Sequence, residues 1–401
     1  MNIIELKELL NEKKICIVGA GKLGREDGYL FLKTFLQWEE VYFYDNNLQV
    51  GVEVVEGIRT VSFDFLCVNK EEIVCCIVVE KSTIQEELKL QLEKAGIKKI
   101  YTLNSKDIFI MCREINKVDS EKVCNYFKCR KYEIQIETTS YCNARCEFCP
   151  NYSLKRTKNF MSDEVFSKII ERIKEEKINV STFILHLNGE PLTDKKIFER
   201  IKYIRSEFAE DIKIRFTSNF SLANDQVIKE IFESGLDEIT CSLNAINEKD
   251  YKDITGLDYK KTIENINKLL DYKKNENRKL DITFSIVKTP NNTREVERFK
   301  ELYSDKVKVR VMEVGNWVNA EAKRENVKRS RDEICPILYR TINILSNGDY
   351  ALCCFDAEGI VGGNVMDMSI ETAWKMEIFK RIRDRHIRYG KTNPECLECS
   401  Y

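Results

Sequence analysis

The sequence predicts an α/β protein with a small N-terminal α/β unit, a longer partial barrel of parallel strands and a short C-terminal segment. Two observations support this fold class. Glycines follow an apolar run near the start of the chain, and strand-like runs later alternate with helical stretches. The 401 residues are enough for two or three domains of about 100–200 residues each.

The net charge gives no sign of a charged partner. Lys and Arg total 65 and Asp and Glu total 66, so there is no basic excess of the kind that binds nucleic acid or anionic membranes. No run approaches the roughly 18 apolar residues of a membrane span, and the opening MNIIELKELLNEKK is amphipathic rather than a signal peptide. We therefore expect a cytoplasmic protein that binds neither nucleic acid nor a membrane.

The N-terminal unit has the pattern of a Rossmann-like domain. The run KKICIVGAGKLG passes from a strand into a turn with Gly19, Gly21 and Gly24, and the second strand, VYFYDNN, reaches Asp45. In a dinucleotide-binding fold such glycines admit a pyrophosphate to the helix N-terminus, and the acid meets the ribose. A nucleotide such as NAD is therefore one expectation for these four residues. The alternative is a turn that keeps its glycines only for helix packing.

Strand-like runs rich in β-branched residues form the middle of the chain, with helical stretches between them. Right-handed crossovers would curl these parallel strands into a partial (β/α)6 TIM-like barrel, with chemistry at the carboxyl ends of the strands. The runs are YEIQIETTS, TFILHL, IKIRFTS, EITCSL, LDITFSIV and VKVRVMEV. The expected domain bounds are 1–118 for the Rossmann-like unit, 119–130 for a linker, 131–318 for the barrel and 319–401 for the C-terminal segment.

The chain has 16 cysteines, which in a reducing cytoplasm favours metal binding, redox chemistry or burial over disulfides. Cys142, Cys146 and Cys149 stand together in YCNARCEFCP, directly after the first strand of the barrel. A four-iron cluster normally takes four thiolates, so three thiolates leave one iron open for another ligand. The alternatives are a zinc knuckle without a local fourth ligand and fortuitous clustering.

This cysteine loop resembles that of the radical S-adenosylmethionine (radical SAM) superfamily, and the resemblance covers about Tyr132 to Val314. It implies that the three cysteines hold a 4Fe–4S cluster whose open iron is chelated by S-adenosylmethionine, with Phe148 beside the adenine. It also implies the family's reaction. One electron from the cluster cleaves S-adenosylmethionine to a 5′-deoxyadenosyl radical, which abstracts hydrogen from a substrate.

The turn NGEPLTD after the second strand is similar to the family's GGEP element, with Asn188 in place of the first glycine. The resemblance implies that the backbone of this turn and Glu190 receive the methionine amino group, because an anionic pocket suits an ammonium. The cofactor-binding residues implied here are Asn188, Gly189, Glu190 and Pro191.

Two further strand ends resemble cofactor-binding positions of the family. The third strand ends in TSN, which implies that Ser218 and Asn219 lie near the ribose and carboxylate. The fourth ends in SLNA, similar to the family's SLDA, with Ser242 retained and Asn244 in place of the aspartate. An amide can still hydrogen-bond a ribose hydroxyl.

The C-terminal segment resembles the SPASM/Twitch extensions of radical SAM proteins, in which C…G-x4-C…C-x2-C wraps an auxiliary 4Fe–4S cluster. The resemblance implies Cys335, Cys353, Cys396 and Cys399 as its ligands. Cys354 competes with Cys353 for the second position, and a zinc site with four thiolates is the alternative. A full SPASM domain continues into more cysteines, and this chain stops, so we expect one auxiliary cluster.

The resemblance implies an enzyme, and we expect a polar small-molecule substrate such as a sugar, an aminocyclitol or a nucleotide-linked sugar. The N-terminal unit resembles modules attached to glycan biosynthesis enzymes, which is the reason for this choice. A two-electron oxidation aided by the auxiliary cluster is one expected outcome, since an iron–sulfur cluster accepts an electron and zinc does not. A flavodoxin or ferredoxin would act as electron donor. The alternatives are an enzyme that modifies a peptide or protein side chain and a non-catalytic iron–sulfur or nucleotide-sensing protein.

Two other residues could meet the substrate. Glu313, near the end of the sixth strand, and Asp356, just after the CC pair, are candidate bases, with a solvated or structural acid as the alternative. His186 lies within TFILHLN, where a satisfied core histidine is the more frequent role.

Overall fold

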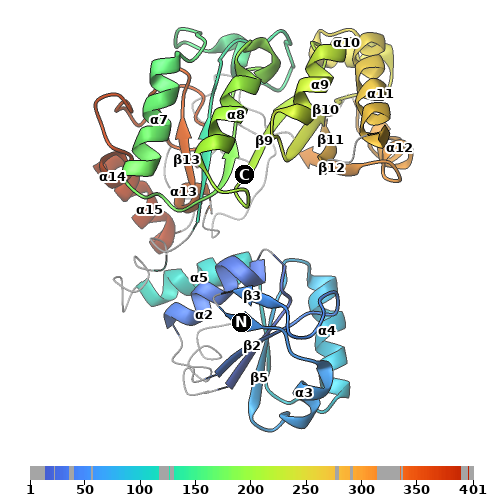
Figure 1. Cartoon of the computed structure of the whole chain (residues 1–401), viewed down its shortest axis with the longest axis vertical. Helices are drawn as coiled ribbons and strands as arrows, with labels where there is room; N and C mark the ends of the chain where they lie inside the picture. The colour runs from blue at the N-terminus through green and yellow to red at the C-terminus, as the bar shows by residue number, and fades with distance from the viewer. Residues whose placement is uncertain are drawn as a thin grey trace. The chain divides into compact units, whose positions relative to one another are not determined.

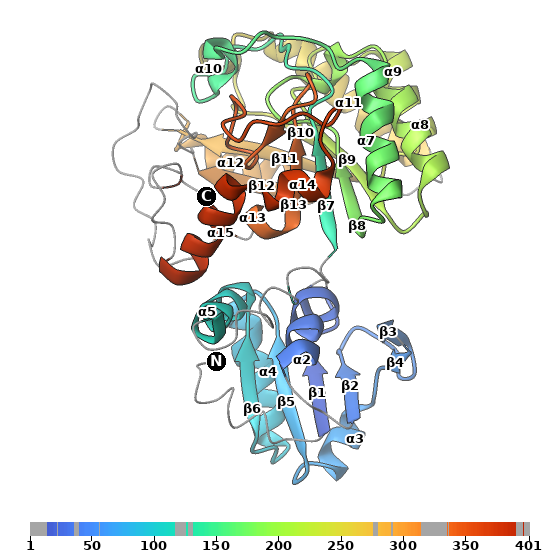
Figure 2. The ribbon, with the colours of Figure 1, turned by 90° about the vertical axis from the view of Figure 1, so that its left-hand side faces the viewer.

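The computed structural model divides the chain into two compact units, whose elements are labelled in Figures 1 and 2. Unit one comprises Met1–Lys131, Ser330–Tyr339 and Arg383–Thr392, and unit two comprises Tyr132–Arg329, Arg340–Ile382 and Asn393–Tyr401. The structure describes residues 14–21, 23–35, 40–55, 57–116, 126, 131–275, 280–289, 292–313, 335, 337–389 and 396. The domain bounds expected from the sequence stay predictions.

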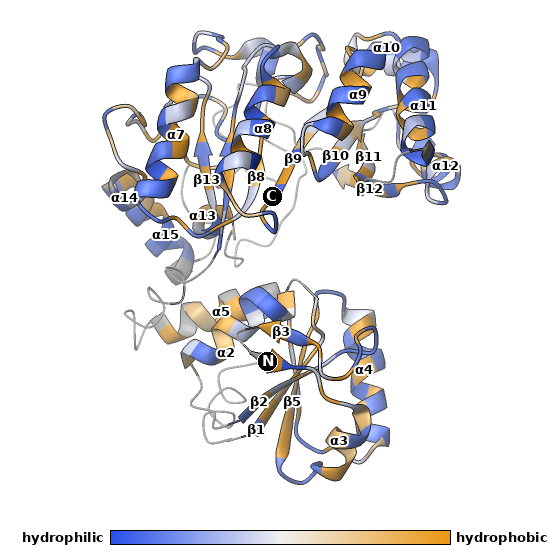
Figure 3. Ribbon diagram, viewed as in Figure 1, coloured by the Kyte–Doolittle hydropathy of each residue, from blue (hydrophilic) through white to orange (hydrophobic). Residues whose placement is uncertain are grey.

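Unit one contains a parallel sheet in the order β2-β1-β5-β6. All six residues of β5, IVCCIV, are buried and appear orange in Figure 3, as is typical of a parallel strand covered on both faces. The strands are β1 Lys14–Val18, β2 Glu40–Tyr44, β5 Ile73–Val78 and β6 Ile100–Leu103, with a small hairpin of β3 Glu53–Val55 and β4 Ile58–Arg59. The helices are η1 Gly24–Gly28, α2 Tyr29–Phe35, α3 Phe63–Val68, α4 Ser82–Lys94 and α5 Ser105–Asn116.

The glycine turn after β1 brings the first helix close to the sheet. A Cβ atom at Gly24 would lie 1.9 Å from the carbonyl oxygen of Gly19, whereas one at Gly21 would meet nothing within 4 Å. The Asp45 carboxylate accepts a hydrogen bond from the backbone N–H of Ala20 at 2.7 Å, so the acid also stabilises this turn. Packing therefore accounts for Gly24 and part of the role of Asp45. Nucleotide binding at the turn stays a prediction.

Unit two contains an eight-stranded sheet in the order β12-β11-β10-β9-β8-β7-β13-β14. Neighbouring strands from β7 to β12 pair in parallel, as the sequence predicts for the partial barrel. The strands are β7 Tyr132–Ile136, β8 Val180–Ile184, β9 Lys213–Ser218, β10 Glu238–Ser242, β11 Asp281–Lys288, β12 Lys308–Glu313, β13 Thr341–Ile344 and β14 Tyr350–Ala351. The sequence analysis did not predict β13, which pairs in parallel with β7 and forms an antiparallel pair with β14.

The helices between the barrel strands pack against one face of this sheet. They are α7 Asp163–Glu175, α8 Ile197–Glu207, α9 Asp225–Glu233, α10 Glu248–Thr255, α11 Tyr259–Asn275 and α12 Glu295–Tyr303. Short 3-10 turns, η2 Pro150–Ser153 and η3 Pro191–Thr193, follow the cysteine loop and the NGE turn. The C-terminal helices are α13 Ile337–Arg340, α14 Ile370–Lys375 and α15 Glu377–Tyr389. Residues from α7 to α12 share one hydrophobic core with alternate residues of the strands, including Ile134, Phe183 and Phe216.

The opposite face of the barrel sheet, which we call the inner face, carries polar side chains. Thr217, Thr240 and Thr283 are paired in register across three strands and form one row on this face. In the next row the Ser242 and Ser285 hydroxyls lie 3.3 Å apart. A packed barrel interior is usually filled with branched apolar residues, whereas these rows on the inner face are polar.

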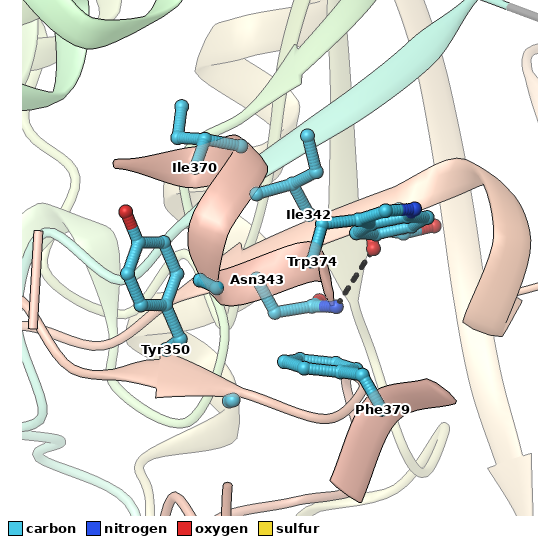
Figure 4. Close-up of a pocket in the computed structure, with 9 residues that line it drawn as sticks. Ile342, Asn343, Tyr350, Ile370, Trp374 and Phe379 are labelled. Carbon is cyan, nitrogen blue, oxygen red and sulfur yellow. Dashed lines mark hydrogen bonds between the residues drawn. The ribbon is translucent and has the colours of Figure 1, made fainter. Parts of the chain in front are cut away.

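The C-terminal segment of unit two packs on the β13 side of the sheet through aromatic contacts. Trp374 meets Tyr132 edge-on with ring centroids 5.4 Å apart, and it stacks on Phe379 at 6.1 Å. Figure 4 shows Asn343, Trp374 and Phe379 beside a cavity of about 10 Å³. Asn343 Oδ1 has no hydrogen-bond partner among the described residues. A cavity of this size holds at most about one water molecule.

A search of the described helices for one long and apolar enough to cross a membrane gives no candidate.

Replacing Gly24 by Ala is expected to destabilise unit one, because the added methyl would meet backbone that cannot move aside. Overpacking of this kind typically costs about 1–3 kcal/mol in the free energy of unfolding. Gly21→Ala is the matched control, since its Cβ has open space. Denaturant unfolding compares the two variants, and equal midpoints would contradict the packing role of Gly24.

Candidate metal centre and its surroundings

The loop with Cys142, Cys146 and Cys149 follows β7 and is anchored to the end of α10. The backbone N–H groups of Arg145 and Glu147 donate to the carbonyl oxygens of Thr255 and Ile254 at 2.9 and 3.0 Å. Within the loop, the N–H of Cys149 donates to the carbonyl of Cys146 at 3.0 Å. These backbone hydrogen bonds hold the loop in a defined shape between β7 and α10.

The three thiols are partly buried, and burial raises their pKa values. The pKa of Cys142 is raised to about 12, and the pKa values of Cys146 and Cys149 are raised for the same reason. Because a thiol must lose its proton to bind metal, metal binding here releases protons and becomes tighter as the pH rises.

The donor set of this loop fits an iron–sulfur cluster. Soft thiolates are the usual ligands of such clusters, and a four-iron cluster normally takes four of them. Three soft thiolates in one loop therefore fit the cluster and leave one iron for another ligand.

The NGE turn packs directly on the chain that enters the cysteine loop. A Cβ atom at Gly189 would lie 2.0 Å from the carbonyl oxygen of Thr139 and 2.9 Å from that of Tyr141. The N–H of Glu190 donates to the Tyr141 carbonyl at 2.9 Å. Only glycine fits at residue 189 in this packing.

The Glu190 carboxylate joins the ends of β8 and β9. It accepts hydrogen bonds from the Ser218 hydroxyl at 2.7 Å and from the N–H groups of Asn219 and Leu192 at 2.8 and 3.1 Å. Burial raises its pKa, and these hydrogen bonds oppose the rise. Since a carboxylate has about four lone-pair positions, one remains for an amino group. The structure thus brings together Glu190, Ser218 and Asn219.

Asn143, between the first two cysteines, is a site residue that the sequence analysis missed. Its Oδ1 accepts from Asn219 Nδ2 at 2.9 Å, and its Nδ2 donates to the Ser221 hydroxyl at 2.8 Å. The Ser221 hydroxyl in turn donates to Asn219 Oδ1 at 2.7 Å. A polar residue inside the cysteine loop was the only sequence signal for this closed ring of hydrogen bonds.

Asn244 links the end of β10 to the end of β11 through hydrogen bonds. Its side-chain oxygen accepts from the N–H of Val287 at 3.0 Å, and its carbonyl accepts from Asn292 Nδ2 at 2.8 Å. The amide N–H₂ of Asn244 is the part of the side chain left for a ribose hydroxyl. The contacts of Asn244 and Ser242 with a cofactor stay predictions, as does the place of Phe148, which packs at the edge of the helix-side core.

A second missed residue, Glu137, lies fully buried just after β7. Its Oε1 accepts from Arg156 Nη2 at 2.6 Å and from the backbone and side-chain N–H groups of Asn188 at 3.3 and 3.1 Å. Its Oε2 accepts from the N–H and hydroxyl of Ser346 at 3.0 and 2.8 Å. Arg156 Nη1 and Asn188 Oδ1 are buried beside it without partners among the described residues. One carboxylate therefore joins the cysteine-loop exit, the NGE turn and the C-terminal segment.

Family comparisons agree with this geometry. Residues 136–303 match the model of the radical SAM superfamily, and residues 335–400 match that of an iron–sulfur cluster-binding domain, SPASM. The chain carries a radical SAM domain followed by a SPASM domain. The predicted α/β fold class and the resemblance are thereby confirmed.

Individual relatives cover parts of the chain. An uncharacterized protein of Methanocaldococcus jannaschii is 33% identical over 126 residues, which is 31% of this chain and 38% of the relative. A GTP 3′,8-cyclase of Clostridium perfringens is 27% identical over 219 residues, 54% of this chain and 64% of the enzyme. The chain thus spans less than two thirds of the length of either curated relative. The structure of SuiB from Streptococcus suis bound to S-adenosylmethionine superposes on this chain with a TM-score of 0.54 at 17% identity. The match covers 79% of this chain and 81% of SuiB, so the two proteins share a fold.

In the SPASM domain, the described cysteines differ in burial. Cys335, Cys353 and Cys396 are all less than a tenth exposed, whereas Cys354 is more open. A buried thiolate suits a shielded cluster, which supports Cys353 over Cys354 as the ligand. Cys399 lies outside the described residues, and the full ligand set stays a prediction.

Of the two candidate bases, Asp356 is buried and Glu313 is exposed. Asp356 is fully buried, and its carboxylate accepts from the N–H groups of Leu352, Gly359 and Ile360 at 2.8, 2.9 and 3.0 Å. This geometry favours the structural role, because the acid shapes the loop after Cys353. Glu313 is exposed at the end of β12 and pairs with Lys288 at 3.5 Å, as expected of a solvated acid.

His186 stands at the inner face of the radical SAM domain. Its Nδ1 accepts from the N–H of Thr217 at 3.1 Å, so Nε2 carries the proton of the neutral ring. Burial, and then the charge of Arg215, lowers its pKa to about 3. His186 is therefore a neutral hydrogen-bond donor at any physiological pH rather than an acid or base.

The variant Gly189→Ala is expected to lose the cluster of the radical SAM domain. The new methyl would push against the backbone at Thr139 and Tyr141 and displace the cysteine loop. Iron and sulfide analysis after anaerobic reconstitution measures the loss, which should be about four irons per chain. Full iron content with unchanged S-adenosylmethionine affinity would contradict this packing.

Replacing Glu137 by Gln should destabilise unit two strongly. Glutamine keeps the shape of the glutamate side chain but leaves the charge of Arg156 buried without its partner. Such a loss typically lowers the free energy of unfolding by about 3–5 kcal/mol. Glu171→Gln on α7 is the matched control, because the Glu171 carboxylate is exposed and pairs with Lys168 at the surface. Chemical denaturation of both variants measures this loss of stability. An unfolding midpoint of Glu137→Gln equal to that of the control would refute the stabilising role of the Glu137 carboxylate.

Proposed function

We propose that this chain is an enzyme that reductively cleaves S-adenosylmethionine and abstracts hydrogen from a polar small molecule. The observation that carries the proposal is the packing of the NGE turn on a loop of three cysteines, with no fourth protein ligand in that loop. When bound, a 4Fe–4S cluster would supply the electron that splits S-adenosylmethionine into methionine and the 5′-deoxyadenosyl radical.

The residues of the chain would bind and orient the cofactor. Cys142, Cys146 and Cys149 would hold the cluster, and the free lone pair of Glu190 and nearby carbonyls would accept from the methionine ammonium. The hydrogen-bonded ring of Asn143, Asn219 and Ser221 keeps the cysteine loop and the end of β9 in fixed relation. Such a preorganised site loses little entropy when the cofactor binds.

The polar side chains of the inner face support the proposal of a polar substrate. The rows of threonine and serine hydroxyls, with the Nε2–H of His186, offer neutral donors and acceptors that match the hydroxyl groups of a sugar or cyclitol. The similarity to enzymes named GTP 3′,8-cyclase, whose name includes a nucleotide, also supports a polar small molecule. A peptide substrate is the alternative outcome of substrate screening.

The SPASM domain would bind one auxiliary 4Fe–4S cluster through Cys335, Cys353, Cys396 and Cys399. Such a cluster can accept an electron, which suits a reaction that removes two electrons from the substrate. The buried Asp356 would keep the loop after Cys353 in shape through its backbone hydrogen bonds.

Anaerobic reconstitution tests the proposal. The wild type is expected to hold about eight irons and to form 5′-deoxyadenosine with dithionite, and a Cys142→Ala, Cys146→Ala, Cys149→Ala variant to hold about four irons and form none. About four irons plus one zinc in the wild type would give the SPASM site a structural role. Eight irons without cleavage of S-adenosylmethionine would refute the enzyme and favour a binding protein.

A further inference from the structure

Lys158 holds a positive charge beside the cysteine loop of unit two. Its Nζ donates to the side-chain oxygen of Asn151 at 2.8 Å, and it forms no ion pair with an acid among the described residues. Asn151 belongs to the turn η2, which begins directly after Cys149. A lysine without an acid partner usually extends its ammonium into water, whereas the Lys158 side chain is half-buried.

Asn151 fixes the ammonium in this place. Its side chain is buried, and its Nδ2 donates to the carbonyl oxygens of Ser140 and Asn188 at 2.8 and 2.7 Å. Ser140 lies two residues before Cys142, and Asn188 begins the NGE turn. One amide therefore ties the entry of the cysteine loop to the NGE turn and leaves its oxygen for Lys158.

The charge of Lys158 acts on two of the three thiols. Burial raises the pKa values of Cys142 and Cys149, and the charge of Lys158 opposes the rise at both. The Glu190 carboxylate has the opposite effect, since it raises the pKa of Cys142 further. Lys158 therefore favours negative charge on the sulfur atoms of this loop.

Other charged groups of this region are exposed or paired. Arg145 and Glu147 within the loop are exposed and carry opposite charges, and solvent screens both of them. The Lys155 side chain is also exposed. Arg156 pairs with the buried carboxylate of Glu137 at 2.6 Å, which neutralises its charge. The half-buried ammonium of Lys158 is thus placed to act on the loop with less screening than the exposed cations.

We propose that the Lys158 ammonium makes the cluster held by Cys142, Cys146 and Cys149 easier to reduce. The inference rests on the proposed function, since it requires that cluster. Reduction moves one electron from the reductant to the cluster, so the negative charge of the cluster and its thiolates grows by one. A fixed cation nearby stabilises the reduced form more than the oxidised form, and charge and hydrogen bonding set the reduction potentials of such clusters.

A redox titration of the reconstituted full chain, followed by electron paramagnetic resonance, measures this effect without relying on activity. Lys158→Met should lower the equilibrium constant for reduction of the cluster about tenfold, which for one electron is a midpoint about 59 mV more negative. Lys158→Arg keeps the charge and should titrate like the wild type. Lys155→Met is the matched control, because it removes the same charge from an exposed side chain of the same segment. The signal of this cluster is the one that changes when S-adenosylmethionine is added.

A Lys158→Met midpoint equal to that of the wild type, at full iron content, would overturn the inference, and so would an equal shift in Lys155→Met. If Lys158→Met loses the cluster, Lys158→Gln repeats the titration. Loss of the cluster from both variants but not from Lys158→Arg would also overturn the inference, because Lys158 would then serve cluster assembly.

The proposed function fails in a different way. Wild-type protein whose cluster is reduced but does not cleave S-adenosylmethionine would refute the enzyme, while a more negative midpoint of Lys158→Met in the same titration would still support the role of Lys158.

Discussion

The buried carboxylate of Glu137 is the contact on which the site of unit two depends. It lies directly after β7, five residues before Cys142, and its partners come from three segments that are far apart in sequence. A buried charge is stable only when paired and hydrogen-bonded, so Arg156, Asn188 and Ser346 must all reach it. The position of each segment is therefore set by the same two oxygen atoms.

The connection through Arg156 extends to the SPASM domain. Its guanidinium Nε donates to the carbonyl of Ala357 at 2.6 Å, close to the loop that Asp356 shapes after Cys353. Strand β13 also pairs with β7, so the SPASM domain continues the radical SAM sheet rather than standing apart from it. The loop proposed for the auxiliary cluster is thus fixed to the same strand that leads into the first cysteine loop.

Sequence patterns predicted the parts of this architecture that repeat locally. The six barrel strands and their order followed from alternation and helical spacing, and the cysteine loop fell after β7 as expected. Strand β13 was missed because TINI is short, and its partner β7 lies about two hundred residues earlier, where no local periodicity can indicate it. The roles of Glu137 and Arg156 likewise arise from tertiary contacts between distant segments, and nothing in their immediate neighbours distinguishes them from solvated residues. The surroundings of Asp356 could not be predicted either, because neighbours in the sequence do not reveal a buried acid that accepts hydrogen bonds from backbone N–H groups.

The central claim is that an iron left open by three cysteines binds S-adenosylmethionine next to the NGE turn. Electron–nuclear double resonance on the reduced, reconstituted protein tests it most directly, with S-adenosylmethionine isotopically labelled at its amino nitrogen. The expected result is a magnetic coupling between the cluster and the labelled nucleus, which disappears when the three cysteines are replaced by alanine. A reduced cluster that shows no such coupling at saturating S-adenosylmethionine would contradict the claim.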